Sequence, residues 1–263
     1  MLSHWVNRFW HHLLDRLYPP TCVLCRGDGE PGWDLCAACR EELPRNTRCC
    51  SVCAIPLPLL IQAEQRCGVC QRHPPGFDRV TAPFLYTYPL RELIITLKFQ
   101  QQLALAPLLG RLLAEELLPL IGAGDAFSVW PEVIMPVPLH PHRLRERGFN
   151  QALELARPLA RQLQIPLDLK VCQRIHHTVP LSSLTAKARR SAIRGAFAVT
   201  TPSRYRHVVL LDDVVTTGST VNELATLLLR SGVERVDVWA LARTAQLVES
   251  PETSDYTNKL MSH

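Results

Sequence analysis

Nine of the ten cysteines lie between Cys22 and Cys70, and eight of them form four Cys-x-x-Cys pairs. Two thiolates two residues apart can hold one tetrahedral zinc ion from a tight turn, and a second pair completes the coordination shell. A segment with so few apolar runs cannot bury a core of its own, so bound metal would supply much of its folding free energy. The pattern predicts two structural zinc sites. Their expected ligands are Cys22, Cys25, Cys36, Cys39, Cys50, Cys53, Cys67 and Cys70.

Other interpretations of the cysteines are weaker. A disulfide framework would require export, and the first twenty residues lack the apolar core and cleavage site of a signal peptide. A single Cys-x-x-Cys would suggest redox chemistry, but four such pairs favour metal. Sequential pairing is favoured, interleaved pairing stays open, and Cys49 is an alternative to Cys50. Cys172 is expected to be a small core residue.

Strands and helices are expected to alternate from residue 76 to residue 243. Apolar runs predict strands at residues 80–88, 132–137, 207–211 and 235–242, and helical spacing predicts helices at residues 90–99, at 105–120, after 150, and before Ser231-Gly232. Pro158 is expected to kink or split the third helix. Continuous apolar strands are typical of a sheet covered on both faces. The expected fold class is therefore α/β, a parallel sheet with helices on both faces.

The chain divides into four parts. Residues 1–20 are expected to form an amphipathic helix, residues 21–75 a double zinc ribbon, residues 76–243 the α/β domain, and residues 244–263 a disordered tail. The chain has no run of 18 apolar residues, so no membrane-spanning helix is expected. The first helix is expected to pack on the protein, with attachment to a membrane surface as the alternative.

A pair of acids follows the strand "HVVLL". Asp212 and Asp213 precede a turn of small residues and then a helix, at the strand end where open α/β sheets bind ligands. Backbone amides of the turn and the following helix N-terminus can hold a phosphate, although the nucleoside-triphosphate P-loop pattern is absent. The turn residues expected to contact phosphate are Thr216, Thr217, Gly218, Ser219 and Thr220.

The acids would repel phosphate, so they are expected to bind sugar hydroxyls or Mg²⁺. A ribose 5-phosphate that carries a pyrophosphate meets each requirement: Asp212 and Asp213 on the ribose, the turn on the 5′-phosphate, and Mg²⁺ with basic residues on the pyrophosphate. The same two acids are the expected catalytic residues if the sugar is transferred.

The stretch "LLDDVVTTGST" resembles the phosphoribosyl pyrophosphate (PRPP) motif of type I phosphoribosyltransferases. Together with the four cysteine pairs, "PPGFDRV", "LKFQ", "PVPLHPHRLRERGFNQALELA" and "GAFAV", it is similar to the ComF/GntX family over about residues 22–243. The resemblance implies a double zinc ribbon fused to a type I phosphoribosyltransferase-like domain. It also implies handling of single-stranded DNA in natural transformation or DNA utilisation, contact with other competence proteins, and a cytoplasmic location, with peripheral attachment at the inner membrane face as an extension.

Basic residues supply further candidates. The segment 138–195 holds eleven Lys and Arg against three acids, a net charge of +8. An extended loop would place alternating arginines on one side, suited to pyrophosphate or DNA, with a solvated loop as the alternative. Lys98 is a candidate phosphate contact or a snorkelling core lysine. Val137 resembles the position where phosphoribosyltransferases bind pyrophosphate through the backbone. The candidates for pyrophosphate or DNA are Arg143, Arg145, Arg147, Asn150 and Gln151.

The sequence leaves three functions open: a PRPP-binding protein that handles DNA, an active Mg²⁺-dependent phosphoribosyltransferase with an unassigned acceptor base, and a scaffold with a vestigial site. The intact acids and turn argue against the third. Phe149 is a candidate for stacking on a base. The chain departs from the family pattern at Leu181 and Ala192, where amides are usual, and this puts part of the ligand or DNA site in doubt.

Overall fold

The computed structural model describes residues 19–59, 65–122, 130–176, 193–201 and 203–245. Nearly all of the predicted N-terminal helix and C-terminal tail lies outside these residues, as do Leu181 and Ala192. None of the described helices is both long and apolar enough to cross a lipid bilayer.

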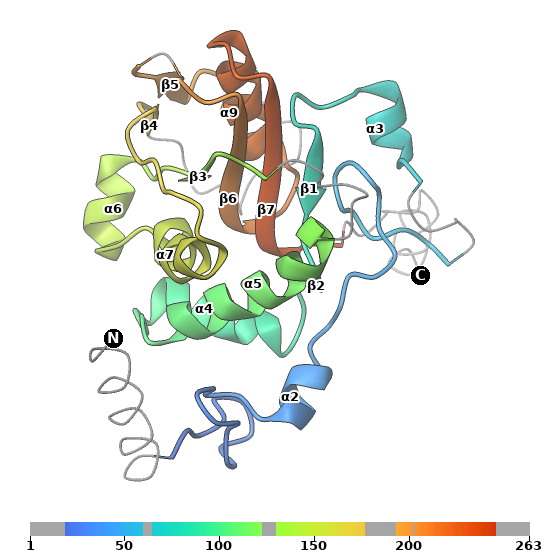
Figure 1. Ribbon diagram of the computed structural model, residues 1–263, viewed down its shortest axis with the longest axis vertical. Helices are drawn as coiled ribbons and strands as arrows, with labels where there is room; N and C mark the ends of the chain where they lie inside the picture. Colours follow the sequence, from blue (N-terminus) through green and yellow to red (C-terminus); the bar gives the residue numbers. More distant parts are fainter. Residues whose placement is uncertain (1–18, 60–64, 123–129, 177–192, 202, 246–263) are drawn as a thin grey trace, which may run out of the picture.

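A parallel sheet in the order β1-β7-β6-β3 forms the centre of the molecule (Figure 1). Its strands are β1 (Arg79–Thr81), β2 (Phe84–Leu85), β3 (Val133–Pro136), β6 (His207–Val215) and β7 (Arg235–Arg243). β2 also pairs with β7, further along the strand than β1 does. The predicted strand of residues 80–88 is thus divided in two, because Pro83 has no N–H for the strand ladder.

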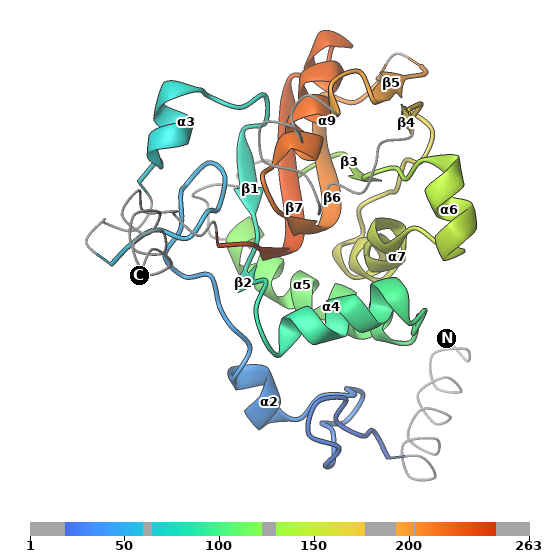
Figure 2. The same cartoon turned by 180° about the vertical axis from the view of Figure 1, so that it is seen from behind.

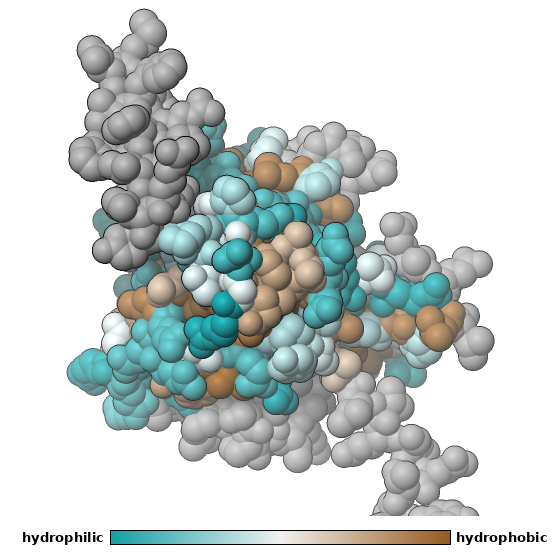
Figure 3. Space-filling view, turned by 90° about the horizontal axis from the view of Figure 1, so that it is seen from below, coloured by the Kyte–Doolittle hydropathy of each residue, from teal (hydrophilic) through white to brown (hydrophobic). Residues whose placement is uncertain are grey.

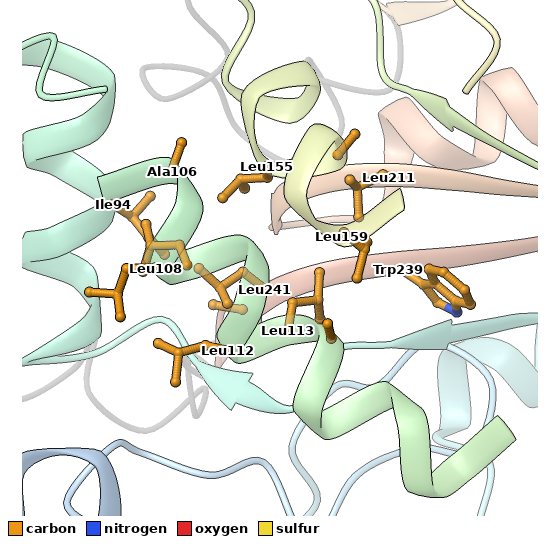
Figure 4. Packing of buried hydrophobic residues seen from close by; sticks show 14 of the residues in the cluster. Ile94, Ala106, Leu108, Leu112, Leu113, Leu155, Leu159, Leu211, Trp239 and Leu241 are labelled. Atoms are coloured by element: carbon orange, nitrogen blue, oxygen red, sulfur yellow. The ribbon is translucent and has the colours of Figure 1, made fainter. Parts of the chain in front are cut away.

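Alternate residues of β6 face two different hydrophobic layers. Val209 and Leu211 pack against α4 (Leu90–Phe99), α5 (Leu105–Gly122) and α7 (Gln151–Leu163). Val208 and Leu210 belong to the layer that contains α9 (Ser219–Arg230). Figure 4 shows side chains of α5 and α7 meeting those of β6 and β7 in the first layer. The prediction of a parallel sheet covered on both faces is confirmed.

Helix α7 remains continuous through Pro158, so a split is wrong and a kink at this residue stays a prediction. The proline packs against Gly110 of α5, where a Cβ would lie only 2.4 Å from Pro158 Cγ and 2.8 Å from the Leu155 carbonyl oxygen. Gly110 lets the two helices approach closely, and the proline ring fills the contact. The apolar residues of α7 that repeat at helical spacing are buried: Ala152, Leu155, Ala156 and Leu159.

The basic segment after β3 is a helix, α6 (Pro141–Arg147), and the predicted extended loop is wrong. Its start and end have local causes. His140 accepts a hydrogen bond from the His142 N–H, and Pro141 at the first helical position already has a helical φ. Gly148, at φ +81°, ends the helix in the left-handed conformation. A short antiparallel pair follows later, β4 (Cys172–Arg174) with β5 (Phe197–Val199).

The two halves of the cysteine-rich region attach to different parts of the α/β domain (Figure 2). The first half, which includes α2 (Ala37–Glu41), packs on α5: the Arg111 guanidinium lies 3.8 Å from the Trp33 ring centroid and donates to the Gly32 carbonyl oxygen at 2.9 Å. The second half, which includes α3 (Gly68–Arg72), joins β1 through a hydrogen bond from the Val80 N–H to the Val52 carbonyl oxygen.

Figure 3 views the molecule from the end that carries α2. Hydrophilic residues cover most of the described surface there, and the hydrophobic residues form separate small patches between them. Scattered apolar residues of this kind are ordinary on a soluble surface and do not mark an interaction site.

Candidate functional site

The first cysteine cluster has the geometry of a tetrahedral metal centre. The four Sγ atoms, of Cys22, Cys25, Cys36 and Cys39, lie within 4.8 Å of one another. The Cys25 and Cys36 sulfurs are 3.8 Å apart, and a tetrahedral zinc ion with Zn–S bonds of ~2.3 Å requires about the same separation. Burial opposes ionisation of Cys22, but hydrogen bonds from the surrounding backbone lower its thiol pKa to about 6. These residues fit zinc.

The second cluster has the same arrangement, with Cys50, Cys53, Cys67 and Cys70. The Cys53 and Cys67 sulfurs are 3.7 Å apart, and the Cys67 N–H donates to the Cys50 sulfur at 3.2 Å. The hydrogen bond from the Cys53 thiol lowers the pKa of Cys50 to about 4. A sulfur that already accepts N–H donors is prepared to bind metal as a thiolate.

The clusters decide between the alternative cysteine pairings. Each site uses two consecutive Cys-x-x-Cys pairs, so sequential pairing is confirmed, and Cys50 rather than Cys49 belongs to the second site. Cys172 is a buried core residue, as predicted. Both sites have four protein sulfurs and no open position, as in structural zinc centres.

The two acids of β6 have different surroundings. Successive side chains of a strand point to opposite faces. Asp213 is buried beneath α4, and its carboxylate forms an ion pair with the Lys98 ammonium group. The Asp213 charge raises the pKa of Lys98 against the effect of burial. Lys98 is therefore neither free nor snorkelling into solvent.

Asp212 is half-buried and lines a shallow pocket with the turn that follows β6. Burial raises the pKa of its carboxyl group well above the ordinary value, and the adjacent Asp213 carboxylate raises it further. Lys98 acts in the opposite direction but does not cancel the effect. Asp212 would gain from a ligand that donates hydrogen bonds or brings a cation.

The turn itself, residues 216–220, presents unused donors to this pocket. Gly218 has φ +77° and caps α9, a conformation that a β-carbon would strain. The Thr217 and Ser219 hydroxyls lie 2.9 Å apart. Within the described part of the chain, the backbone amides of Thr217, Gly218 and Thr220 donate to no protein group. The structure thus brings Asp212 together with all five predicted turn residues.

Arg143 and Arg147 share one face of α6 and line a second cleft with Lys98. Arg145 does not line it, because a residue two positions along a helix points about 200° away. The prediction that all three arginines lie on one side is therefore wrong. The two clefts are neighbours, since Lys98 lines the arginine cleft and pairs with the acid next to Asp212.

The motif "RGFNQ" mainly builds the junction between α6 and α7. The Asn150 side chain caps α7 by accepting from the Ala152 N–H at 3.0 Å, and it donates to the Val137 carbonyl oxygen at 3.0 Å. Gln151 is buried and accepts a hydrogen bond from Arg147 at 2.5 Å. Phe149 is 8% exposed and belongs to the core, so the interpretation of Phe149 as a base-stacking ring is wrong.

The Val137 backbone is also occupied. Its N–H donates to the Leu211 carbonyl oxygen at 2.8 Å, and its own carbonyl accepts from Asn150. In this arrangement Val137 holds β3 beside β6 and has no donor left for pyrophosphate. Asn150 and Val137 thus hold β3 and α7 together, while the Gln151 side-chain oxygen holds Arg147.

Arg174 is a site residue that we did not predict. It lies on β4 with its guanidinium 5.4 Å from the Phe197 ring centroid. Burial lowers its pKa, nearby Arg143 lowers it further, and Asp212 raises it. The charges of Arg143 and Asp212 therefore both act on Arg174. The only sequence signal was its membership of the segment with charge +8.

Arg243 connects the second zinc cluster to the acidic turn. It is 2% exposed, and its Nε donates to the Cys53 carbonyl oxygen at 2.9 Å. Its Nη1 donates to the carbonyl oxygens of Val215, at 3.0 Å, and Thr216. One guanidinium group therefore joins a zinc ligand to the start of the turn.

Comparison with known proteins agrees with this organisation. Residues 13–71 match the double zinc ribbon domain family and residues 150–261 match the phosphoribosyl transferase domain family. DNA utilization protein YhgH of Escherichia coli K12 is 37% identical over 228 residues, which cover 86% of this chain and 98% of the relative. Competence protein F of Haemophilus influenzae is 36% identical over 230 residues, 84% and 96% of the two chains. The chain belongs to the ComF/GntX family.

As in the family pattern, this ComF/GntX protein combines a double zinc ribbon with a phosphoribosyltransferase-like domain. Among solved structures, a purine phosphoribosyltransferase from Pyrococcus horikoshii matches with a TM-score of 0.28 and 18% identity, covering 52% of this chain and 80% of that one. A Bacillus subtilis glutamine PRPP amidotransferase matches with a TM-score of 0.31 and 21% identity, covering 52% and 26%.

Proposed function

We propose that the protein binds PRPP with Mg²⁺ at the acidic turn and handles single-stranded DNA in DNA uptake and utilisation. The observation that carries the PRPP assignment is the pocket in which the Asp212 carboxylate lies beside free amides of residues 217, 218 and 220. Phosphate binds such amides, and vicinal ribose hydroxyls donate to such a carboxylate. Carboxylate oxygens are also ligands that Mg²⁺ prefers.

The buried Asp213–Lys98 pair has a supporting role in this proposal. The Lys98 ammonium group compensates the charge of the Asp213 carboxylate, which is buried away from solvent. Arg143, which lines the neighbouring cleft, is the arginine that we assign to the pyrophosphate or to a DNA phosphate. We assign the ligand contacts to Asp212 and the turn, and the positioning to Asp213.

The DNA part of the proposal rests on charge and on the relatives' names. The relatives are named for DNA utilization and competence. The zinc-ribbon region has six arginines against six acids between residues 22 and 73, so charge favours the +8 segment, residues 138–195, as the DNA-binding surface.

We propose residues 21–75 as the limits of the zinc-ribbon domain and residues 76–243 as the limits of the α/β domain.

A comparison of two arginines of α6 tests the DNA surface. Arg143→Ala is expected to weaken single-stranded DNA binding and to lower the slope of log affinity against log salt by about 0.7, the effect of losing one phosphate contact. Arg145→Ala is the matched control, because Arg145 lies on the same helix outside the cleft. Fluorescence anisotropy at several salt concentrations measures both slopes. Equal slopes for Arg143→Ala and the unaltered protein would place DNA elsewhere.

An active phosphoribosyltransferase is the second candidate, favoured by the cleft beside the acids that could admit an acceptor. The protein would be incubated with Mg²⁺ and PRPP, with and without single-stranded DNA or free bases, while bound PRPP and released pyrophosphate are followed. We expect bound PRPP without sustained pyrophosphate release. Release that depends on DNA or on a base would establish transfer instead, and absence of bound PRPP would contradict both candidates.

A further inference from the structure

The arginine cleft beside the acidic turn contains an exposed aromatic ring. The cleft has a volume of about 210 Å³ and lies between the end of α4 and α6. Its lining residues are Lys98, Phe99, Gln101, Arg143, Glu146 and Arg147. This is below the ~300–1,000 Å³ typical of pockets for drug-sized ligands, so the cleft suits one small planar group better than a whole cofactor.

Phe99 is held in place but is not covered. It is the last residue of α4 and is 69% exposed. The Arg147 guanidinium lies 5.5 Å from its ring centroid, and Gln151 fixes Arg147 in turn through a hydrogen bond of 2.5 Å. The residue thus presents much of its ring to solvent from a fixed position, which is the arrangement that stacks on a nucleobase.

One of the basic side chains that line the cleft, Arg143, can bind a phosphate. Lys98 is committed to Asp213, and Arg147 to Gln151. Within the described residues, the Arg143 guanidinium has no hydrogen-bond acceptor and no carboxylate partner. A free guanidinium on the same side as an exposed ring is the combination that single-stranded nucleic acid recognises, with the base on the ring and the phosphate on the cation.

We infer that this cleft stacks one base of single-stranded DNA on Phe99 and binds the adjacent phosphate with Arg143. The inference rests on the proposed DNA function and adds the residue that contacts a base. Lys98 lines the cleft and pairs with Asp213, so the base would lie next to the PRPP pocket. A nucleobase could also reach the cleft as a free nucleotide, and the experiment separates the two sources.

The test uses the full-length zinc-loaded protein and two labelled oligonucleotides of equal length, an oligodeoxythymidylate and its abasic analogue. Phe99→Ala is expected to weaken binding of the normal oligonucleotide about 5- to 150-fold, the effect of losing one base–aromatic stack. Binding of the abasic oligonucleotide, which keeps the phosphates, is expected to stay unchanged. Phe99→Trp is expected to retain the affinity for the normal strand.

Trp130→Ala is the matched control, since Trp130 is an exposed aromatic residue that precedes β3 at the opposite end of the strand. Zinc content and PRPP affinity of each variant show that the fold and the neighbouring site are intact. An equal loss of affinity for both oligonucleotides, or no loss for either, would overturn the stacking assignment while the DNA function stands. Absence of DNA binding by the unaltered protein would overturn both.

Thymidine monophosphate serves as the free-nucleotide arm. Phe99-dependent binding of the monophosphate together with the oligonucleotide supports the stacking site. If Phe99→Ala weakens binding of the monophosphate but not of the oligonucleotide, the base in the cleft comes from a free nucleotide, and the assignment to single-stranded DNA is overturned.

Discussion

Asp212 and Asp213 are neighbours in the chain but perform different physical roles. Asp213 is buried and ion-paired with Lys98, whereas Asp212 lines the pocket with the phosphate-binding turn. The carboxylate that remains available to a ligand is therefore the one whose pKa is raised. The sequence predicted the pair and the turn, but it could not separate the two acids, because that depends on which face of β6 lies beneath α4.

Removal of Lys98 should destabilise the protein strongly. Lys98→Met leaves the buried Asp213 carboxylate without its cation, and the loss of one partner from a buried pair costs about 3–5 kcal/mol. Urea unfolding measures this change in the free energy of unfolding. Lys98→Met combined with Asp213→Asn should recover much of the loss, since no uncompensated charge remains. A loss below about 1 kcal/mol for Lys98→Met alone would show that the pair is open to solvent.

Asp212→Asn should make the protein more stable at pH 7. The folded-state pKa of Asp212 is raised, so the folded chain is destabilised when this carboxyl group is ionised, and the penalty disappears as pH falls through the folded pKa towards ~3.9. The stability difference between variant and parent should therefore be positive at pH 7 and shrink on acidification. Unfolding curves at several pH values measure it. A difference that grows on acidification would contradict the raised pKa.

At the scale of elements, helix α6 shows what the sequence signals could and could not decide. Three arginines alternate, which suggested an extended loop, but Pro141 and Gly148 are standard start and stop signals of a helix. The helix start and stop residues outweigh the alternation of the arginines. The limits of α4, residues 90–99, were predicted correctly, because buried apolar residues recur at helical spacing along it: Leu90, Leu93, Ile94 and Leu97. The attachment of Trp33 to Arg111 was not predictable, since it joins residues 78 positions apart.

Arg243 should couple the second zinc cluster to the turn. Arg243→Met would leave the Cys53 carbonyl oxygen without its donor, at a cost of about 1–3 kcal/mol, and would leave the Val215 carbonyl oxygen with only the Thr244 N–H. We expect easier release of zinc to a chelator and weaker PRPP binding. Arg243→Lys should rescue little, because an ammonium cannot span both partners.

Arg206→Met is the control for Arg243, because Arg206 forms an exposed ion pair with Glu234 just before β6. No measurable loss of stability is expected there, because both charges stay in solvent. Weakened zinc retention with unaltered PRPP affinity in Arg243→Met would show that the cluster and the turn are independent.

At the scale of the whole molecule, the zinc clusters brace two sides of one α/β domain. The first cluster belongs to the hydrophobic layer of α5, and the second lies beside β1 and the end of β7. The cysteine spacing predicted the ligand sets, but where each half attaches depends on tertiary contacts. Asp212, the proposed phosphate-binding turn and the arginine cleft lie at the edge of the sheet formed by the carboxyl ends of its parallel strands.

A calorimetric titration of PRPP into the zinc-loaded protein with Mg²⁺ tests the PRPP site, with the unaltered chain and Asp212→Asn compared. We predict Mg²⁺-dependent binding by the unaltered chain and a loss of at least about tenfold in Asp212→Asn, since a hydrogen bond to a charged group contributes ~1.5–3 kcal/mol. Equal affinity of the two proteins, or no binding by the unaltered one, would contradict the assignment of the acidic turn to PRPP.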